Sequence, residues 1–159
     1  MTEAYHLADA LEGLLANAEN GWFTSMTVAI AGLTAEQAAM VPAPRFNSIW
    51  AVVNHVRVCH DAVLRSLRGL PWATEDDWPP PGDPADEPAW QAAYERAIAS
   101  NKELAAFIAG LADDALDQPL APGEARRYQF IHGLIAHNGY HTCEIISIRH
   151  MLGLWLEQT

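Results

Sequence analysis

Apolar residues recur at intervals of three and four along four long stretches of the chain, which is the period of an amphipathic α-helix. The predicted helices cover residues 3–31, 49–70, 88–111 and 125–156. No run of four or more residues alternates as a strand does, and no unit repeats at a fixed interval. Four such helices can hide their apolar stripes against one another, so the pattern predicts an all-α, up-down four-helix bundle. The first stripe comprises Leu7, Leu11, Leu14, Leu15, Ala18, Trp22 and Met26.

Helix-capping and helix-breaking residues mark where these helices start and stop. Thr34, with Gln37 three residues later, predicts a capped turn that Pro42 and Pro44 bring to an end. Ser48 is a good cap for the helix predicted to begin at residue 49. We therefore expect a connecting loop between the first two long helices.

A long loop is predicted between the second and third helices. Residues 71–88 hold six of the ten prolines and many acidic side chains, a composition that supports neither helix nor strand. Trp72 and Trp78 favour packing of this loop on the body of the protein, as a lid over a cavity, whereas its charge and proline content favour a solvated linker. Both interpretations stay open at this stage. The acidic residues are Glu75, Asp76, Asp77, Asp83, Asp86 and Glu87.

Length and composition indicate one folded domain over residues 1–159. Half of the residues are hydrophobic, which suffices for a packed core. The formal net charge of −11 repels nucleic acid and anionic lipid, so neither is expected as a partner. No apolar run approaches the roughly 18 residues of a membrane span, and the N-terminus lacks the pattern of a signal peptide. We expect a cytoplasmic protein in which Cys59 and Cys143 are free thiols.

Three histidines are predicted to face the interior of the bundle. His137 and His141 lie one helical turn apart on the apolar stripe of the fourth helix, and His55 lies on the stripe of the second. The other four, predicted to be surface histidines, are His6, His60, His132 and His150. The stripe of the fourth helix comprises Phe130, Leu134, His137, His141, Glu144, Ile148, Leu152 and Trp155.

Three buried imidazoles without partners would cost several kcal/mol, whereas a divalent metal binds all three as neutral ligands. Two ligands one turn apart and a third from a facing helix leave a coordination position open, as in catalytic sites. The alternative is that these histidines are bonded to carbonyls or hydroxyls. Cys59, one turn from His55, is either a soft extra ligand or, as we favour here, a core residue.

Two segments carry a resemblance to a known family. Phe46–His55 and His137–His141, taken together, resemble the DinB/YfiT-like superfamily of small four-helix-bundle metalloenzymes. The resemblance implies a divalent-metal site formed by His55, His137 and His141, and it implies a homodimer, for which exposed apolar residues such as Trp22 and Phe23 give weak additional support. Imidazoles bind zinc, nickel, copper and iron alike, and we expect zinc or nickel.

Glu144 is the candidate catalytic residue. Many members of the family have Gln at this position, three residues after the last ligand, so the carboxylate could be a fourth ligand, an anchor for an imidazole N–H or a general base. The resemblance implies a thiol-dependent transferase or isomerase that takes a small-molecule substrate and a low-molecular-weight thiol. A metal-dependent hydrolase and a non-enzymatic metal-binding stress-response protein are the alternatives.

Overall fold

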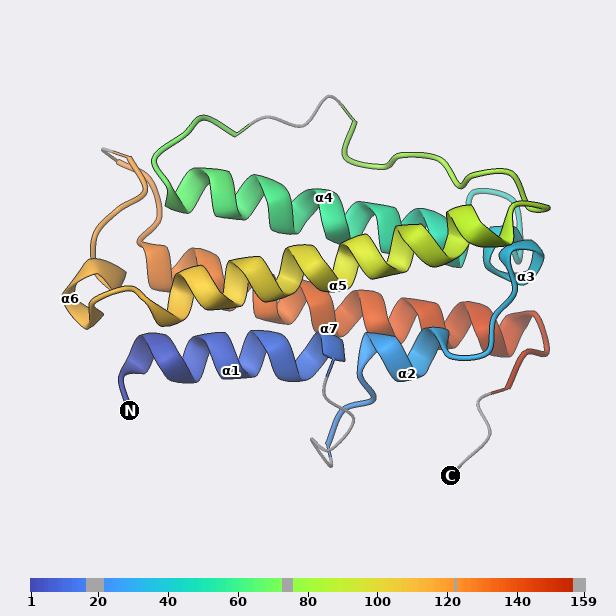
Figure 1. The fold of residues 1–159 in the computed structure, drawn as a ribbon, viewed down its shortest axis with the longest axis horizontal. Helices are drawn as coiled ribbons and strands as arrows, with labels where there is room; N and C mark the ends of the chain where they lie inside the picture. Colours follow the sequence, from blue (N-terminus) through green and yellow to red (C-terminus); the bar gives the residue numbers. More distant parts are fainter. Residues whose placement is uncertain (17–21, 73–75, 122, 156–159) are drawn as a thin grey trace.

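The computed structural model describes residues 1–16, 22–72, 76–121 and 123–155, and within these ranges the chain is helical with no strand (Figure 1). Residues 17–21 of the first predicted helix, including Ala18, lie outside the described residues, as do Glu75 and Leu156. The helices are α1 (Glu3–Ala16), α2 (Met26–Ile30), α3 (Ala35–Ala39), α4 (Ile49–Leu67), α5 (Glu87–Ala109), α6 (Asp113–Leu116) and α7 (Arg127–Met151).

The predicted all-α bundle is confirmed. Helix α1 packs on α5 and α7, helix α4 packs on the same two helices, and α2 continues along α7 beyond the end of α1 (Figure 1). None of the described helices is both long enough and apolar enough to cross a lipid bilayer. Each long helix therefore buries its apolar face against two neighbours.

The direction of the helices departs from strict alternation at one step, because α4 and α5 run in parallel (Figure 1). Trp50 lies against Trp90 where both helices begin, with ring centroids 5.4 Å apart. Arg68 pairs with Glu103 near the other end, at 3.0 Å. The described parts of residues 68–86 run back alongside α4, and this return lets α5 start at the same end of the bundle.

Capping side chains set the start of the helices. Ser48 accepts a hydrogen bond from the Ala51 amide at 3.2 Å, and Asp86 does the same for Ala89 at 2.9 Å. The capping box predicted from Thr34 is present at the start of α3. These caps satisfy amide groups that would otherwise lack partners at the helix ends.

The prediction of one continuous helix over residues 3–31 is wrong, because the structure has two helices in this range. Helix α1 ends at Ala16, and α2 begins only at Met26, where the Ser25 hydroxyl accepts from the Val28 amide and caps a new helix. Apolar spacing persists across the break because α2 packs on α7 as well, so periodicity alone could not reveal the interruption. Trp22 was placed on the buried stripe, but it is 90% exposed.

The fourth predicted helix is correct in its centre but too long at its C-terminus. Gly153 adopts a left-handed φ of 71°, and its amide bonds to the His150 carbonyl while the Leu154 amide bonds to that of Arg149. This pair of bonds is a Schellman motif, which ends a helix. Trp155, predicted to point inward, therefore lies beyond α7 and is 65% exposed.

Buried apolar side chains of the described residues form two clusters along the bundle. One surrounds Trp50 and Trp90, and the other surrounds Leu64 and Leu104. Between the clusters lies a layer of buried polar side chains on α4, α5 and α7. Its members are His55, His60, Asn101, Asn138, His141 and Thr142.

The prediction that His60 is a surface histidine is wrong, because its side chain is fully buried. Its Nε2 lies 3.1 Å from Oδ1 of Asn138, a contact between α4 and α7. Helix α4 is covered by α5 on one side and α7 on another, so it has two inward faces, and a single apolar stripe identifies only one of them. His6, His132 and His150 are exposed, as predicted.

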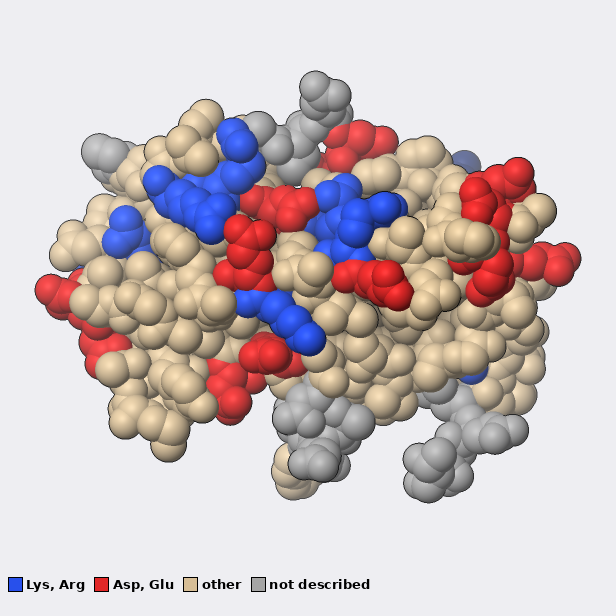
Figure 2. Space-filling view, viewed as in Figure 1, with Lys and Arg blue, Asp and Glu red and all other residues tan. Residues whose placement is uncertain are grey.

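Charged side chains on the surface are mixed in sign. Figure 2 shows basic residues lying next to acidic ones on the face formed by α4 and α5. Arg57 pairs with Asp61 at 2.6 Å, one turn further along α4. Exposed pairs of this kind contribute little to stability.

Protonation of His60 should destabilise the fold. Burial is the main cause that lowers the pKa of His60 from 6.5 to about 4. The pKa of His60 is lower in the folded than in the unfolded protein, so neutral His60 favours the folded state. This contribution to the free energy of unfolding is complete above pH 6.5 and falls by about 3 kcal/mol as the pH falls toward 4. Urea unfolding of metal-free protein at pH 7 and pH 4 should show a smaller loss for His60→Gln than for the parent. His132→Gln, at an exposed site, is the control, and identical losses in the parent and His60→Gln would contradict the assignment.

Candidate metal centre

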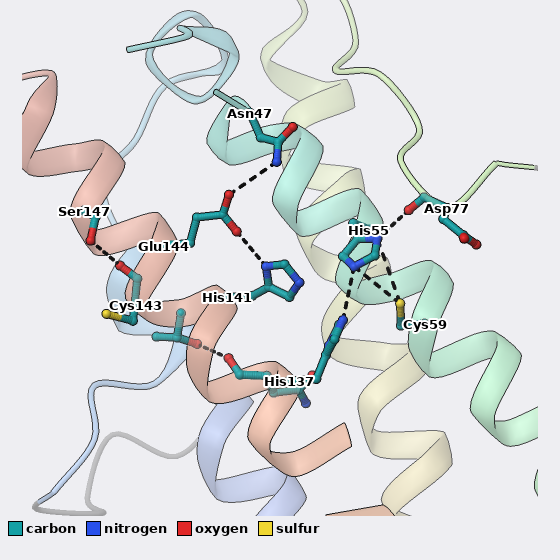
Figure 3. Close-up of polar contacts among 11 residues, drawn as sticks. Asn47, His55, Cys59, Asp77, His137, His141, Cys143, Glu144 and Ser147 are labelled. Carbon is teal, nitrogen blue, oxygen red and sulfur yellow. Dashed lines mark hydrogen bonds and ion pairs between the residues drawn. The ribbon is translucent and has the colours of Figure 1, made fainter. Parts of the chain in front are cut away.

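Three imidazoles converge in the polar layer of the bundle. His55 comes from α4, while His137 and His141 lie one turn apart on α7, and one ring nitrogen of each lies within 4.8 Å of the others (Figure 3). The Nε2 atoms of His55 and His137 are 3.1 Å apart. The structure thus brings together the three histidines that the sequence placed on the inward stripes.

The outer nitrogens of two rings are held by protein groups. Nδ1 of His55 lies 2.5 Å from the Asp77 carbonyl, so this nitrogen donates and Nε2 is left as an acceptor. Nδ1 of His141 lies 2.7 Å from Oε2 of Glu144, whose other oxygen accepts from Asn47 at 3.3 Å (Figure 3). Metal-binding histidines are typically oriented by such hydrogen bonds to their second nitrogen.

The inward nitrogens fit a divalent metal. Nε2 of His141 is buried and has no hydrogen-bond partner among the described residues, and His141 itself is 2% exposed. An unsatisfied buried nitrogen is costly unless a ligand occupies the space beside it. Zinc held about 2.0–2.1 Å from two nitrogens at a tetrahedral angle separates them by about 3.3 Å, close to the 3.1 Å between His55 and His137. This group of histidines could therefore bind a metal ion.

Burial keeps His137 and His141 neutral, as metal binding requires. Burial, with smaller contributions from the neighbouring His141 and His55, lowers the pKa of His137 to about 4. Burial also lowers the pKa of His141, although the hydrogen bond to Glu144 opposes this shift. At neutral pH both rings present a lone pair.

Cys59 lies beside His55 on α4. Its Sγ is 3.6 Å from Nε2 and 4.0 Å from Nδ1 of that ring (Figure 3). Burial, with a smaller contribution from the charge of Asp77, raises the pKa of the Cys59 thiol to about 11. Without a metal the thiol is therefore protonated. Cys143, the second cysteine, is exposed on α7.

Part of the predicted acidic loop covers the site. Trp78 stacks on the His55 ring with centroids 3.9 Å apart and planes at 3°. Asn54 donates to the Pro80 carbonyl at 3.0 Å, and Gly82 lies so close to Trp50 that a Cβ on it would meet the indole at 2.7 Å. Of the two interpretations left open by the sequence, these contacts favour a lid over a solvated linker.

Aromatic residues at the site were missed by the sequence analysis. Trp78 is one, since its stacking partner lies far away in the sequence. Tyr140 is another: its ring lies 4.2 Å from that of His141 and 5.1 Å from that of His137, between centroids. Its position between the two histidines on α7 was the available signal, and burial raises its pKa, so the phenol stays protonated at neutral pH.

The fold and the three converging imidazoles define a helical bundle with a candidate metal site at its centre. The family model of the DinB superfamily matches residues 22–145, which include α2 to α6 and most of α7 with all three histidines. The chain belongs to the DinB superfamily. No curated protein and no solved structure matches it.

Removal of the Glu144 carboxylate should weaken metal binding. Glu144→Ala leaves Nδ1 of His141 without its partner, and the loss of such an anchor lowers metal affinity by about 10- to 100-fold. Glu144→Gln retains an acceptor oxygen and should keep most of the affinity. Zinc titration by calorimetry measures both, with Glu103→Ala on the exposed surface of α5 as the control. Parent-like binding by Glu144→Ala would exclude the anchoring role.

Crowding the lid should disturb both stability and the site. A Cβ at Gly82 would clash with the buried Trp50 ring, so Gly82→Ala should cost about 1–3 kcal/mol and displace Trp78 from His55, lowering zinc affinity. Gly133→Ala is the matched control: nothing lies within 4 Å of its Cβ position, and helix propensity favours Ala by about 1 kcal/mol. Thermal unfolding and zinc titration report the two effects. If Gly82→Ala resembles the parent in both, the lid does not depend on this contact.

Proposed function

We propose that this protein is a metal-dependent enzyme in which His55, His137 and His141 hold a divalent ion, zinc or nickel. The observation that carries the proposal is the unsatisfied, buried Nε2 of His141 beside two further imidazoles that face the same space. Three protein nitrogens leave at least one coordination position free for a small molecule. When bound, a divalent ion would lower the pKa of a water or thiol and so supply a nucleophile near neutral pH.

The surrounding residues supply orientation in this proposal. Asp77 and Glu144 fix which nitrogen His55 and His141 turn inward, so two of the three ligands are oriented before the ion arrives. Glu144 holds both His141 and Asn47, which supports the role of an anchor more than that of a ligand. Its side chain is 30% exposed, so a substrate could still reach it for proton exchange.

The walls of the site favour an organic ligand over water alone. Trp78 covers one side and Tyr140 lies on another, and such aromatic surfaces bind apolar parts of small molecules. The protonated phenol of Tyr140 can also donate a hydrogen bond to a developing negative charge. We therefore place transfer or isomerisation with a low-molecular-weight thiol ahead of hydrolysis.

Metal content and activity test the proposal together. Protein purified without a histidine tag should contain about one zinc or nickel per chain by elemental analysis, and His137→Ala should lose it while remaining helical by circular dichroism. The metal-loaded parent is then assayed for thiol transfer, isomerisation, and ester and amide hydrolysis.

Activity should disappear on chelation, return on addition of metal, and be absent in His55→Ala. Activity that survives both chelation and His55→Ala would remove the metal from the mechanism. Turnover of esters or amides without a thiol would favour the hydrolase. Full metal content with a closed coordination shell and no exchangeable ligand would favour a non-enzymatic metal-binding protein.

A further inference from the structure

Glu144, which holds the ring of His141, is itself held by a side chain from another part of the chain. Nδ2 of Asn47 donates to Oε1 of Glu144 at 3.3 Å, while Oε2 of the same carboxylate accepts from Nδ1 of His141 at 2.7 Å (Figure 3). An ionised carboxylate only accepts hydrogen bonds, so Asn47 presents its amide nitrogen here. We propose that Asn47 is a positioning residue, which rests on the metal site of the proposed function: it fixes the Glu144 carboxylate and, through it, the ring of His141.

The Glu144 carboxylate needs a second partner to stay in place behind His141. Its side chain is 30% exposed, so water competes with the imidazole for both oxygens. Holding a glutamate side chain in one conformation also costs side-chain entropy, which a single hydrogen bond offsets only in part. Two charge-assisted bonds to different oxygens fix the plane of the carboxylate as well as its position. Asn47 supplies the second of these bonds.

Helix α4 fixes Asn47 on its C-terminal side. Ser48, the next residue, is the N-cap of α4 and is buried. The same helix supplies His55, so Asn47 belongs to the segment that carries one candidate ligand, whereas Glu144 belongs to the helix that carries the other two. The hydrogen bond between Asn47 and Glu144 therefore connects the two ligand-bearing helices close to the site.

A tight turn fixes Asn47 on its N-terminal side. The Phe46 amide donates to the Ala43 carbonyl at 3.1 Å, and between them lie Pro44 and then Arg45, which has a φ of 72°. Proline at the second position and a positive φ at the third define a type II turn, whose third position favours glycine. A residue with a side chain is strained there, and strain of this kind is typical of segments that hold functional groups in place.

A variant that keeps the shape of Asn47 but removes its donor tests the proposal. Asn47→Leu branches at the same atom as the parent and should keep its helix content and its melting temperature without metal. Its affinity for zinc should fall by roughly tenfold, the lower end of the effect expected for groups that orient a ligand. Asn47→Ala should show the same loss. The matched control is Gln91→Leu, which removes an amide–carboxylate hydrogen bond on the exposed surface of α5.

A double-mutant cycle tests whether Asn47 acts through Glu144. Asn47→Leu should weaken zinc binding in the parent but change it by less than about twofold in the Glu144→Ala background, because the group it positions is already absent. An equal loss in both backgrounds would overturn the proposal, since Asn47 would then act without Glu144. Zinc affinity equal to that of the parent in both Asn47 variants would overturn it as well.

The metal-free protein gives a readout that separates this proposal from the proposed function. Proton–nitrogen correlation spectra of the parent at pH 7 should show the His141 ring as one tautomer, with its proton on Nδ1, because the Glu144 carboxylate accepts from that atom. Asn47→Leu should show a mixture of both tautomers. An unchanged tautomer would overturn the role of Asn47. If the parent binds no zinc while Asn47→Leu alters the tautomer, the proposed metal site fails and the positioning of His141 by Asn47 stands.

Discussion

A layer of buried polar side chains crosses the bundle between two apolar clusters, and its need for partners governs the organisation around it. Nε2 of His60 lies within hydrogen-bond distance of Oδ1 of Asn138 across α4 and α7, and Thr142 donates to the Asn138 carbonyl. The inward nitrogen of His141 lacks a partner among the described residues, as do Nδ2 of Asn138 and both amide atoms of Asn101. His141 differs in that His55 and His137 bring two further ring nitrogens to the same space, so the layer that interrupts the core also holds the candidate site.

The parallel arrangement of α4 and α5 connects the fold with this site. Because both helices start at the same end, the chain must return along α4 between them, and the return passes directly over His55. There the Asp77 carbonyl fixes one imidazole nitrogen and Trp78 covers the ring. A hairpin between antiparallel helices would have needed only a few residues and would have left His55 uncovered.

Helical periodicity predicted the bundle and the inward face of His55, His137 and His141, since a period of 3.6 residues directly reports which residues share a side of a helix. It failed for His60, because α4 is enclosed by more than one neighbour. It also could not place Trp78, whose position depends on packing of an irregular segment rather than on a repeating pattern. Periodicity also did not reveal that the first predicted helix is interrupted before Ser25, because the apolar spacing continues on both sides of the interruption.

The carboxylate of Glu144 behind His141 would set the charge of the site once a divalent ion is bound. Three neutral imidazoles add nothing to such an ion, so the ion and this carboxylate would leave a formal charge of about +1 in a largely buried layer. One further anion from a small molecule would restore electroneutrality, whereas a second would give an excess negative charge. A preference for singly charged anionic ligands would then follow from the charge balance of the centre, independent of the shape of its surroundings.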